Sequence, residues 1–450
     1  MKFNLNSYWF KSGIFSLLQN LSTLIFGFGG FYFLVRILSK EDFGGWTLFL
    51  TVTSILEVTR VGFIKNGFIK FRAAASEELH GVIFTASFIL NCCFALLISA
   101  SVLIFGSTLA TVWDTPPLKT VFYIYSITSL VLIPFFQFEF LLHAVLDFRS
   151  VFLTYFVRNG FLFFAILMSY LGILKIDLVN LVIFHLAGAL LSSVTAYFFV
   201  KKNLGFSFRL DWSWIWKLVH FGKYASATSL SSMLYSGADQ FMLGSMVSTV
   251  SVAIYSTANR VTNLINIPSL TLSTILFPRS AQAISTGGKA AVKELYEKSV
   301  GSILAIVLPA VLFVSLFPEF VITTVAGAGY IDSVPILKIT VLFTLLLPFS
   351  YQFGTVFDSI GYPNLNFYYT SINLLVNITL NYFLILNYGI MGAVYGTSFT
   401  ALAGFIVMQA MLRKKLNVNT LKVFAFTAQF YKDGFLFIKG IILKTKNETI

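Results

Sequence analysis

Apolar runs of about twenty residues recur along the chain, and the short stretches between them carry most of the charged residues. A run of this length is what an α-helix needs to cross the hydrocarbon core of a bilayer. Twelve segments qualify: 13–35, 43–64, 81–108, 119–143, 151–171, 178–200, 221–244, 250–277, 300–323, 334–357, 367–386 and 390–412. The pattern predicts an all-α membrane protein with twelve transmembrane helices.

The composition excludes an ordinary water-soluble protein. Of the 450 residues 57% are hydrophobic and 11% are charged, whereas soluble domains average about 25% charged residues. The formal net charge is +13, but the basic residues lie between the apolar runs and form no single patch. Lipid headgroups and membrane topology therefore explain this charge better than nucleic acid does.

The distribution of basic residues between the runs predicts the orientation of the chain. With the N-terminus in the cytoplasm, most of the loop cations fall on the inside, among them Lys65, Arg72, Arg149, Lys201, Arg209, Arg279 and Arg413. The other side receives Arg36, Lys40, Lys119 and Lys175. This positive-inside bias predicts that both termini are cytoplasmic.

Two polar stretches divide the chain. In the loop before the seventh run, Trp212, Trp214 and Trp216 recur at every second position beside several cations, which suits the headgroup layer. Lys432, Asp433 and Gly434 interrupt the last apolar stretch, which favours a cytoplasmic interfacial helix over a thirteenth span. The expected parts are an N-terminal six-helix lobe at 1–199, a cytoplasmic amphipathic linker at 200–219, a C-terminal six-helix lobe at 220–415 and a cytoplasmic interfacial tail at 416–450.

The two halves resemble each other. Ser39 matches Ser248, Ile133-Pro134 matches Leu347-Pro348, and Lys201-Lys202 matches Lys414-Lys415, each at an offset of about 210 residues. A shared offset indicates duplication. Because each half holds an even number of helices, both halves insert in the same orientation, as in transporters built from parallel repeats.

Four stretches carry a resemblance to a known family: LVRILSKEDFGGWTLFLTV, SGADQFMLGSMVSTVSVAIYSTANRV, FPRSAQ, and the long stretch from FDSIGYPNLNF to GTSFTALAGF. With them the chain resembles a polysaccharide repeat-unit (Wzx-type, O-antigen or capsule) flippase of the multidrug/oligosaccharidyl-lipid/polysaccharide exporter superfamily. The resemblance implies a MATE-like two-lobed bundle with a central cavity in the bacterial inner membrane. It implies a substrate as well, an undecaprenyl-diphosphate-linked oligosaccharide moved from the cytoplasmic to the periplasmic leaflet by alternating access. The superfamily's lipid II flippases carry two further helices, which one interrupted tail does not supply.

Ionisable residues inside membrane spans are costly, so they usually face a protein interior or a cavity and have partners. Arg60, Arg158 and Arg260 lie inside predicted spans and are candidates to bind the substrate's diphosphate. The resemblance matches Arg260 to the family's Tyr-Ser-x-Ala-x-Arg pattern and Asp239 to its acidic residue in helix seven. The alternative is structural, with ion pairs Glu57–Arg60 on one helix and Asp239–Arg260 across a hairpin.

Asp239, Glu57 and Glu139 are the acidic candidates. Each either serves as a fixed counter-ion or exchanges a proton or a sodium ion during transport. Asn377 shares one helix face with Asn373 and Asn381. These amides bind either sugar hydroxyls or a neighbouring helix.

Enzyme chemistry has no support in the sequence. Cys92 and Cys93 are adjacent and point apart on a helix, the four histidines lack the spacing of metal ligands, and no nucleotide-binding loop follows a strand. We therefore expect no cofactor, no metal and no catalytic residues. The expected partners are membrane lipids, the lipid-linked oligosaccharide, a coupling ion and other polysaccharide-assembly proteins. Two alternatives are a cation-coupled multidrug exporter of the same superfamily and an integral-membrane glycan polymerase or acyltransferase, for which the outside loops are short.

Overall fold

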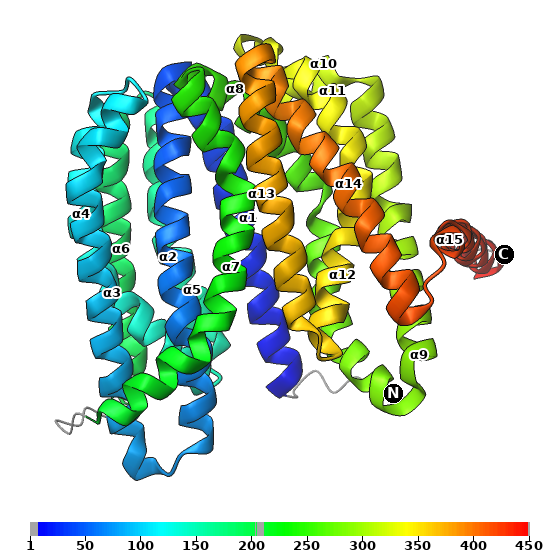
Figure 1. Ribbon diagram of the computed structural model, residues 1–450, viewed down its shortest axis with the longest axis horizontal. Helices are drawn as coiled ribbons and strands as arrows, with labels where there is room; N and C mark the ends of the chain where they lie inside the picture. The colour runs from blue at the N-terminus through cyan, green and yellow to red at the C-terminus, as the bar shows by residue number, and fades with distance from the viewer. Residues whose placement is uncertain (1–7, 203, 205–210, 449–450) are drawn as a thin grey trace. The chain divides into compact units, whose positions relative to one another are not determined.

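The computed structural model describes residues 8–202, 204 and 211–448, and these residues form helices and short connections without strands (Figure 1). Most of the predicted loop at 203–210 lies outside the described residues. Within the described part of the chain, ten helices are long and apolar enough to cross a membrane. The chain is therefore a multi-pass, all-helical membrane protein.

The chain divides into two compact units, Met1–Ala253 and Ile254–Ile450. The first contains α1 (Tyr8–Ile37), α2 (Lys40–Ala74), α3 (Glu77–Val112), α4 (Pro117–Ala144), α5 (Phe148–Tyr170), α6 (Leu178–Val200) and α7 (Trp212–Met246). The next helix, α8 (Thr249–Ile265), crosses the boundary. The second unit contains α9 (Ile267–Leu316), α10 (Pro318–Ala326), η1 (Ala328–Ser333), α11 (Val334–Phe343), η2 (Thr344–Leu346), α12 (Leu347–Ser359), α13 (Pro363–Tyr388), α14 (Ile390–Leu416) and α15 (Thr420–Glu448).

Packing in the first unit places α7 along α2, and Figure 1 shows the two helices side by side. Glycines on α7 allow this approach, because a Cβ at Gly222 would overlap the carbonyl oxygen of Phe63 and a Cβ at Gly244 would lie 2.9 Å from Leu48. The sequence predicts α7 as part of the second half, whereas contacts group it with the first. The four-part division at 199, 219 and 415 stays a prediction.

Prolines break two segments that were predicted as single spans. Segment 250–277 is divided at Asn266 into α8 and α9, with Pro268 in the first turn of α9. Segment 334–357 is divided into α11 and α12, with Pro348 in the first turn of α12. A proline has no backbone N–H for a helical hydrogen bond, so a new helix begins there more easily than an old one continues.

The long helix α9 contains its own bend. Gly288 has φ 63° and ψ −156° inside α9, so the helix consists of two segments that meet at this residue. A left-handed φ of this kind favours glycine. The predicted loop 278–299 is thus mostly helical and joins the two predicted spans on either side of it.

Large apolar side chains remain exposed along the outer helices, as expected of a surface that contacts lipid. On α3 they include Leu96, Leu97, Ile104 and Phe105. Each unit also has an inner core: Phe68, Phe84 and Phe140 lie in the first core, and Tyr296, Phe353 and Met408 lie in the second.

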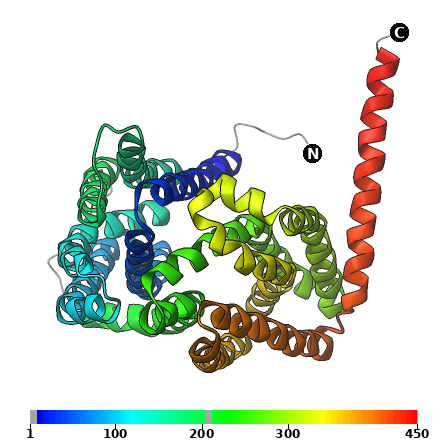
Figure 2. The same ribbon diagram turned by 90° about the horizontal axis from the view of Figure 1, so that it is seen from above.

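Helix α15 lies crosswise to the other long helices of the second unit. Figure 1 shows α15 end-on beside α14, and Figure 2 shows it lengthwise at the edge of the second unit. Its first turns pack on α9, where Thr427 Oγ1 donates to the carbonyl of Gly301 at 3.1 Å and Tyr431 donates to that of Ala305 at 2.6 Å. The interfacial position of this tail stays a prediction.

Candidate functional site

The first unit contains a cavity of about 380 Å³ between α2, α4, α5 and α7. Its polar lining consists of Glu57, Lys65, Asn66, Tyr155, Arg158 and Ser229, and Phe136 with two valines provides most of the apolar wall. We call it the charged cavity. It brings together Glu57 and Arg158, which the sequence predicted as candidate site residues, and Lys65, which the sequence did not predict.

An ion pair between α2 and α5 stands at the wall of the charged cavity. Arg158 Nη2 donates to Glu57 Oε2 at 3.2 Å and to Oε1 at 3.4 Å, and both side chains are largely buried. Tyr125 donates to the same Glu57 Oε1 at 3.0 Å. The predicted structural pair Glu57–Arg60 is therefore wrong, because Glu57 points toward α5 and its ion-pair partner is Arg158.

Arg60 lies behind this wall and is fully buried. Its Nε donates to Asn91 Oδ1 at 2.6 Å and its Nη1 donates to the carbonyl of Ser129 at 3.1 Å. Among the residues that the structure describes, its Nη2 has no hydrogen-bond partner. Neutral acceptors thus hold this guanidinium in place while leaving its positive charge without a carboxylate partner.

The two arginines share one aromatic ring. The guanidinium carbon of Arg60 lies 4.9 Å from the ring centroid of Phe136, and that of Arg158 lies 5.6 Å from it. Arg158 also lies 4.8 Å from the ring of Phe135. Contacts between cations and ring faces stabilise desolvated guanidinium groups, and here they place both charges on the side of the cavity formed by α4.

A second charged group lies between α2 and α4. Lys65 Nζ donates to Glu139 Oε1 at 2.6 Å, and His143 Nε2 lies 3.1 Å from the same oxygen. Glu139 is 1% exposed. Sequence reasoning missed Lys65 because it lies one residue beyond the predicted end of its span, whereas α2 continues to Ala74.

The balance of charge at this site is positive. The three cations Arg60, Lys65 and Arg158 stand against the two carboxylates Glu57 and Glu139. Isolated charges are expensive in a medium of low dielectric constant, so each carboxylate stabilises its cation when no substrate is present. A further anion would meet one net positive charge.

The remaining candidates lie elsewhere in the fold. Asp239 is buried on α7 in the first unit, and Arg260 lies on α8 in the second. Their pairing across the hairpin stays a prediction. Asn377 Nδ2 donates to Thr397 Oγ1 at 3.0 Å, and Asn381 Nδ2 donates to Asn377 Oδ1 at 3.3 Å, so these amides make contacts between α13 and α14 and along α13.

A metal site finds no support in the residues that the structure describes, which contain no group of three or more His, Cys, Asp or Glu side chains able to hold an ion. Cys92 and Cys93 are free thiols. The chemistry of the charged cavity is therefore that of guanidinium, ammonium and carboxylate groups.

Comparison with known proteins identifies the family. The sequence profile described as "polysaccharide biosynthesis protein" matches residues 33–335, about two thirds of the chain. The chain belongs to this family. The probable low-salt glycan biosynthesis flippase Agl15 of Haloferax volcanii is 25% identical over 181 residues, which are 40% of this chain and 38% of that protein. An uncharacterized membrane protein of Methanocaldococcus jannaschii, MJ1068, is 26% identical over 211 residues, which are 47% of this chain and 40% of that protein.

Solved structures show the fold. The lipid II flippase MurJ in an inward closed conformation has a TM-score of 0.77 at 14% identity, over 94% of this chain and 92% of MurJ. An inward-facing MATE family multidrug resistance transporter of the MOP superfamily has a TM-score of 0.75 at 18% identity, over 88% of this chain and 96% of the transporter. This member of the polysaccharide biosynthesis family has the two-lobed transporter fold that the sequence predicted, although the alignments to its curated relatives span well under half of their length.

Proposed function

We propose that the protein is a flippase that moves a lipid-linked oligosaccharide diphosphate across the membrane. The observation that carries the proposal is the charged cavity, where Arg158 and Lys65 line a space of about 380 Å³ and Arg60 lies 4.9 Å from the ring centroid of the lining residue Phe136. A diphosphate brings negative charge into a region of low dielectric constant, and guanidinium and ammonium groups are the side chains that stabilise it there. The family and the name of the Haloferax relative support the same class of substrate.

In this proposal each cation has a distinct role. Arg158 binds the diphosphate directly because its planar guanidinium matches two phosphate oxygens. Lys65 provides a point charge from α2, and Arg60, which lies outside the lining, adds a fixed positive field. The polyprenyl chain stays in the lipid bilayer, and the sugars lie in the water-filled cavity. Asn377 and Arg260 remain candidate contacts for the substrate in the second unit.

The proposed cycle is alternating access, with undecaprenyl-diphosphate oligosaccharide accepted from the cytoplasmic leaflet of a bacterial inner membrane and released to the periplasmic leaflet. Both termini then lie in the cytoplasm. Glu57, Glu139 and Asp239 are the candidate sites for a coupling proton or sodium ion. The protein acts as a transporter and not as an enzyme, and the positive charge of the site argues against export of cationic drugs.

The test is a flipping assay in liposomes that contain the full chain and a fluorescent undecaprenyl-diphosphate oligosaccharide. A charge-assisted hydrogen bond contributes about 1.5–3 kcal/mol, so Arg158→Ala should slow flipping by about 10- to 100-fold. Lys298→Ala is the matched control, because Lys298 is an exposed cation that pairs with Glu294 on the surface of α9. A folded Arg158→Ala protein that flips at the wild-type rate would exclude Arg158 from the substrate path.

A second arm tests the substrate class. The same oligosaccharide on an undecaprenyl monophosphate carries less negative charge and offers fewer oxygens to Arg158 and Lys65. We expect the wild-type protein to flip the monophosphate lipid more slowly than the diphosphate lipid. The Arg158→Ala variant should flip the two lipids at similar rates. Equal rates for both lipids in the wild type would show that the diphosphate is not the recognised group.

A further inference from the structure

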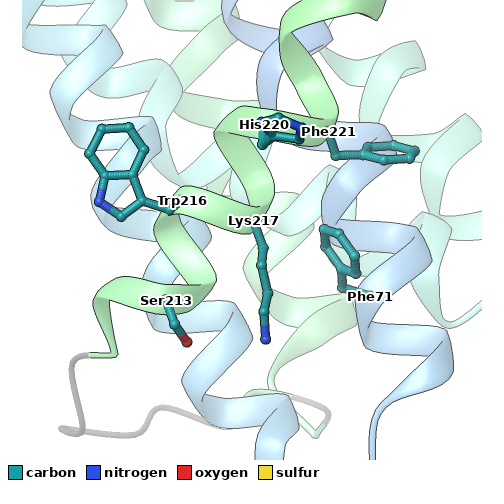
Figure 3. Close-up of a pocket in the computed structure, with 6 residues that line it drawn as sticks. All are labelled: Phe71, Ser213, Trp216, Lys217, His220 and Phe221. Atoms are coloured by element: carbon teal, nitrogen blue, oxygen red, sulfur yellow. The ribbon is translucent and has the colours of Figure 1, made fainter.

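A second pocket, distinct from the charged cavity, lies where the end of α2 meets the beginning of α7. It encloses about 570 Å³ and is lined by Phe71, Ser213, Trp216, Lys217, His220 and Phe221 (Figure 3). We call it the aromatic pocket. The transport pathway proposed above makes no use of these residues.

Aromatic rings form most of the pocket wall. The rings of Phe71 and Phe221 lie 5.7 Å apart, and Phe71 also lies 5.8 Å from Trp214, two turns before Phe221 on α7. Trp216 is 69% exposed, and Figure 3 shows it on the side of α7 away from Phe71. An indole this exposed, beside a pocket walled by phenyl rings, is typical of the boundary between lipid tails and headgroups.

Cations surround this aromatic wall. Lys217 Nζ lies 4.0 Å from the ring centroid of Trp214, and Lys70 Nζ lies 4.4 Å from that of Phe221. Lys223 Nζ lies 3.3 Å from His220 Nδ1. The carboxylate on this part of α7 is Asp211, which caps the helix by accepting from the Ser213 N–H at 2.8 Å. The rim of the pocket is therefore positively charged.

We propose that the aromatic pocket binds an anionic phospholipid, with its phosphate at Lys217 and Lys70 and the upper part of an acyl chain against Phe71 and Phe221. The positive-inside bias places this end of the unit at the cytoplasmic leaflet, where basic pockets between helices bind anionic headgroups. Charge complementarity selects an anionic lipid over a zwitterionic one, and the aromatic wall selects a lipid over a free phosphate ion.

The test uses full-length protein in nanodiscs that contain a fixed small fraction of lipid with brominated acyl chains, either phosphatidylglycerol or phosphatidylcholine. Bromine quenches tryptophan on contact, so Trp216 reports occupancy of the pocket. Brominated phosphatidylglycerol should quench more strongly than brominated phosphatidylcholine, and replacing both Trp214 and Trp216 by Phe should remove this difference. The preference is the ratio of binding of phosphatidylglycerol to binding of phosphatidylcholine. Lys217→Gln should lower this ratio about fivefold, the effect of one basic residue near an anionic surface.

Lys201→Gln is the matched control. Lys201 is an exposed cation at the end of α6, near the ring of Phe198 and outside the pocket, so its loss should leave the preference unchanged. The proposal is overturned if both lipids quench equally, or if Lys217→Gln keeps the wild-type preference. Displacement of the lipid by soluble glycerol phosphate would identify a phosphate site instead, and displacement by equimolar undecaprenyl diphosphate would identify an access point for the substrate.

Discussion

Removing one carboxylate from the charged cavity should destabilise the protein more than removing the whole ion pair. Glu57→Gln keeps the size of the side chain and leaves an oxygen that accepts from Tyr125, but Arg158 then loses its carboxylate. The side chain of Arg158 is 11% exposed and that of Glu57 is 18% exposed. Neither residue has enough contact with water to replace the partner.

The expected magnitude follows from this burial. Breaking a buried pair by removing one partner costs about 3–5 kcal/mol because the other charge stays buried without compensation. We expect about 3 kcal/mol for Glu57→Gln and a similar loss for Arg158→Gln, since both groups line a cavity. The double variant lacks both charges of this pair, so its loss should be smaller than that of either single variant, and the coupling between the two sites should be large.

The measurement is the free energy of unfolding in detergent for the wild type, both single variants and the double variant, with flipping in liposomes as a second readout. The double variant should regain stability without regaining transport, because it lacks the guanidinium that we assign to the diphosphate. Glu294→Gln is the control: it removes an exposed carboxylate from its pair with Lys298, and exposed pairs contribute little. Additive losses in the double variant would refute the reasoning, as would full transport by it.

Four further substitutions test the packing. Gly222→Ala should destabilise the protein by about 1–3 kcal/mol, because its Cβ would overlap the carbonyl of Phe63; Gly27→Ala, with nothing within 4 Å, should be neutral or slightly stabilising in the same unfolding assay. Asn377→Ala should cost about 0.6 kcal/mol in thermal unfolding, and wild-type flipping by this variant would assign Asn377 to helix packing. Tyr431→Phe should release the start of α15 for limited proteolysis, at a cost of about 1 kcal/mol; an unchanged cleavage pattern would show that other contacts hold α15 in place.

Apolar length predicted the spans well and their interruptions poorly. Segment 178–200 coincides with α6, because Asp177 caps its beginning and the apolar run ends at a pair of lysines. The break before Pro268 was missed, since hydropathy is unchanged across it. The extension of α2 through Lys65 to Ala74 was missed for the opposite reason, because polar residues continue a helix once a neighbouring helix packs against it.

The candidate site was found in part for a simple physical reason. A charge inside an apolar span is costly, so its presence alone nominated Arg60, Arg158, Glu57 and Glu139. The sequence did not predict their partners. The i,i+3 spacing allows Glu57 to pair with Arg60, but in the structure Glu57 pairs with Arg158 on α5. Which helices are neighbours decides the pairing, and a single sequence does not provide this information.

The pairing itself bears on how a flippase would release its substrate. A transported anion must bind well enough to enter the site and weakly enough to leave it. Three cations without carboxylate partners around a space of about 380 Å³ would bind a diphosphate tightly, and the protein would then release its substrate too slowly. In the proposed mechanism Glu57 and Glu139 prevent this, because Glu57 pairs again with Arg158 and Glu139 pairs again with Lys65 as the diphosphate leaves. Arg60, fixed by neutral acceptors, keeps the site attractive to the next anion throughout the cycle.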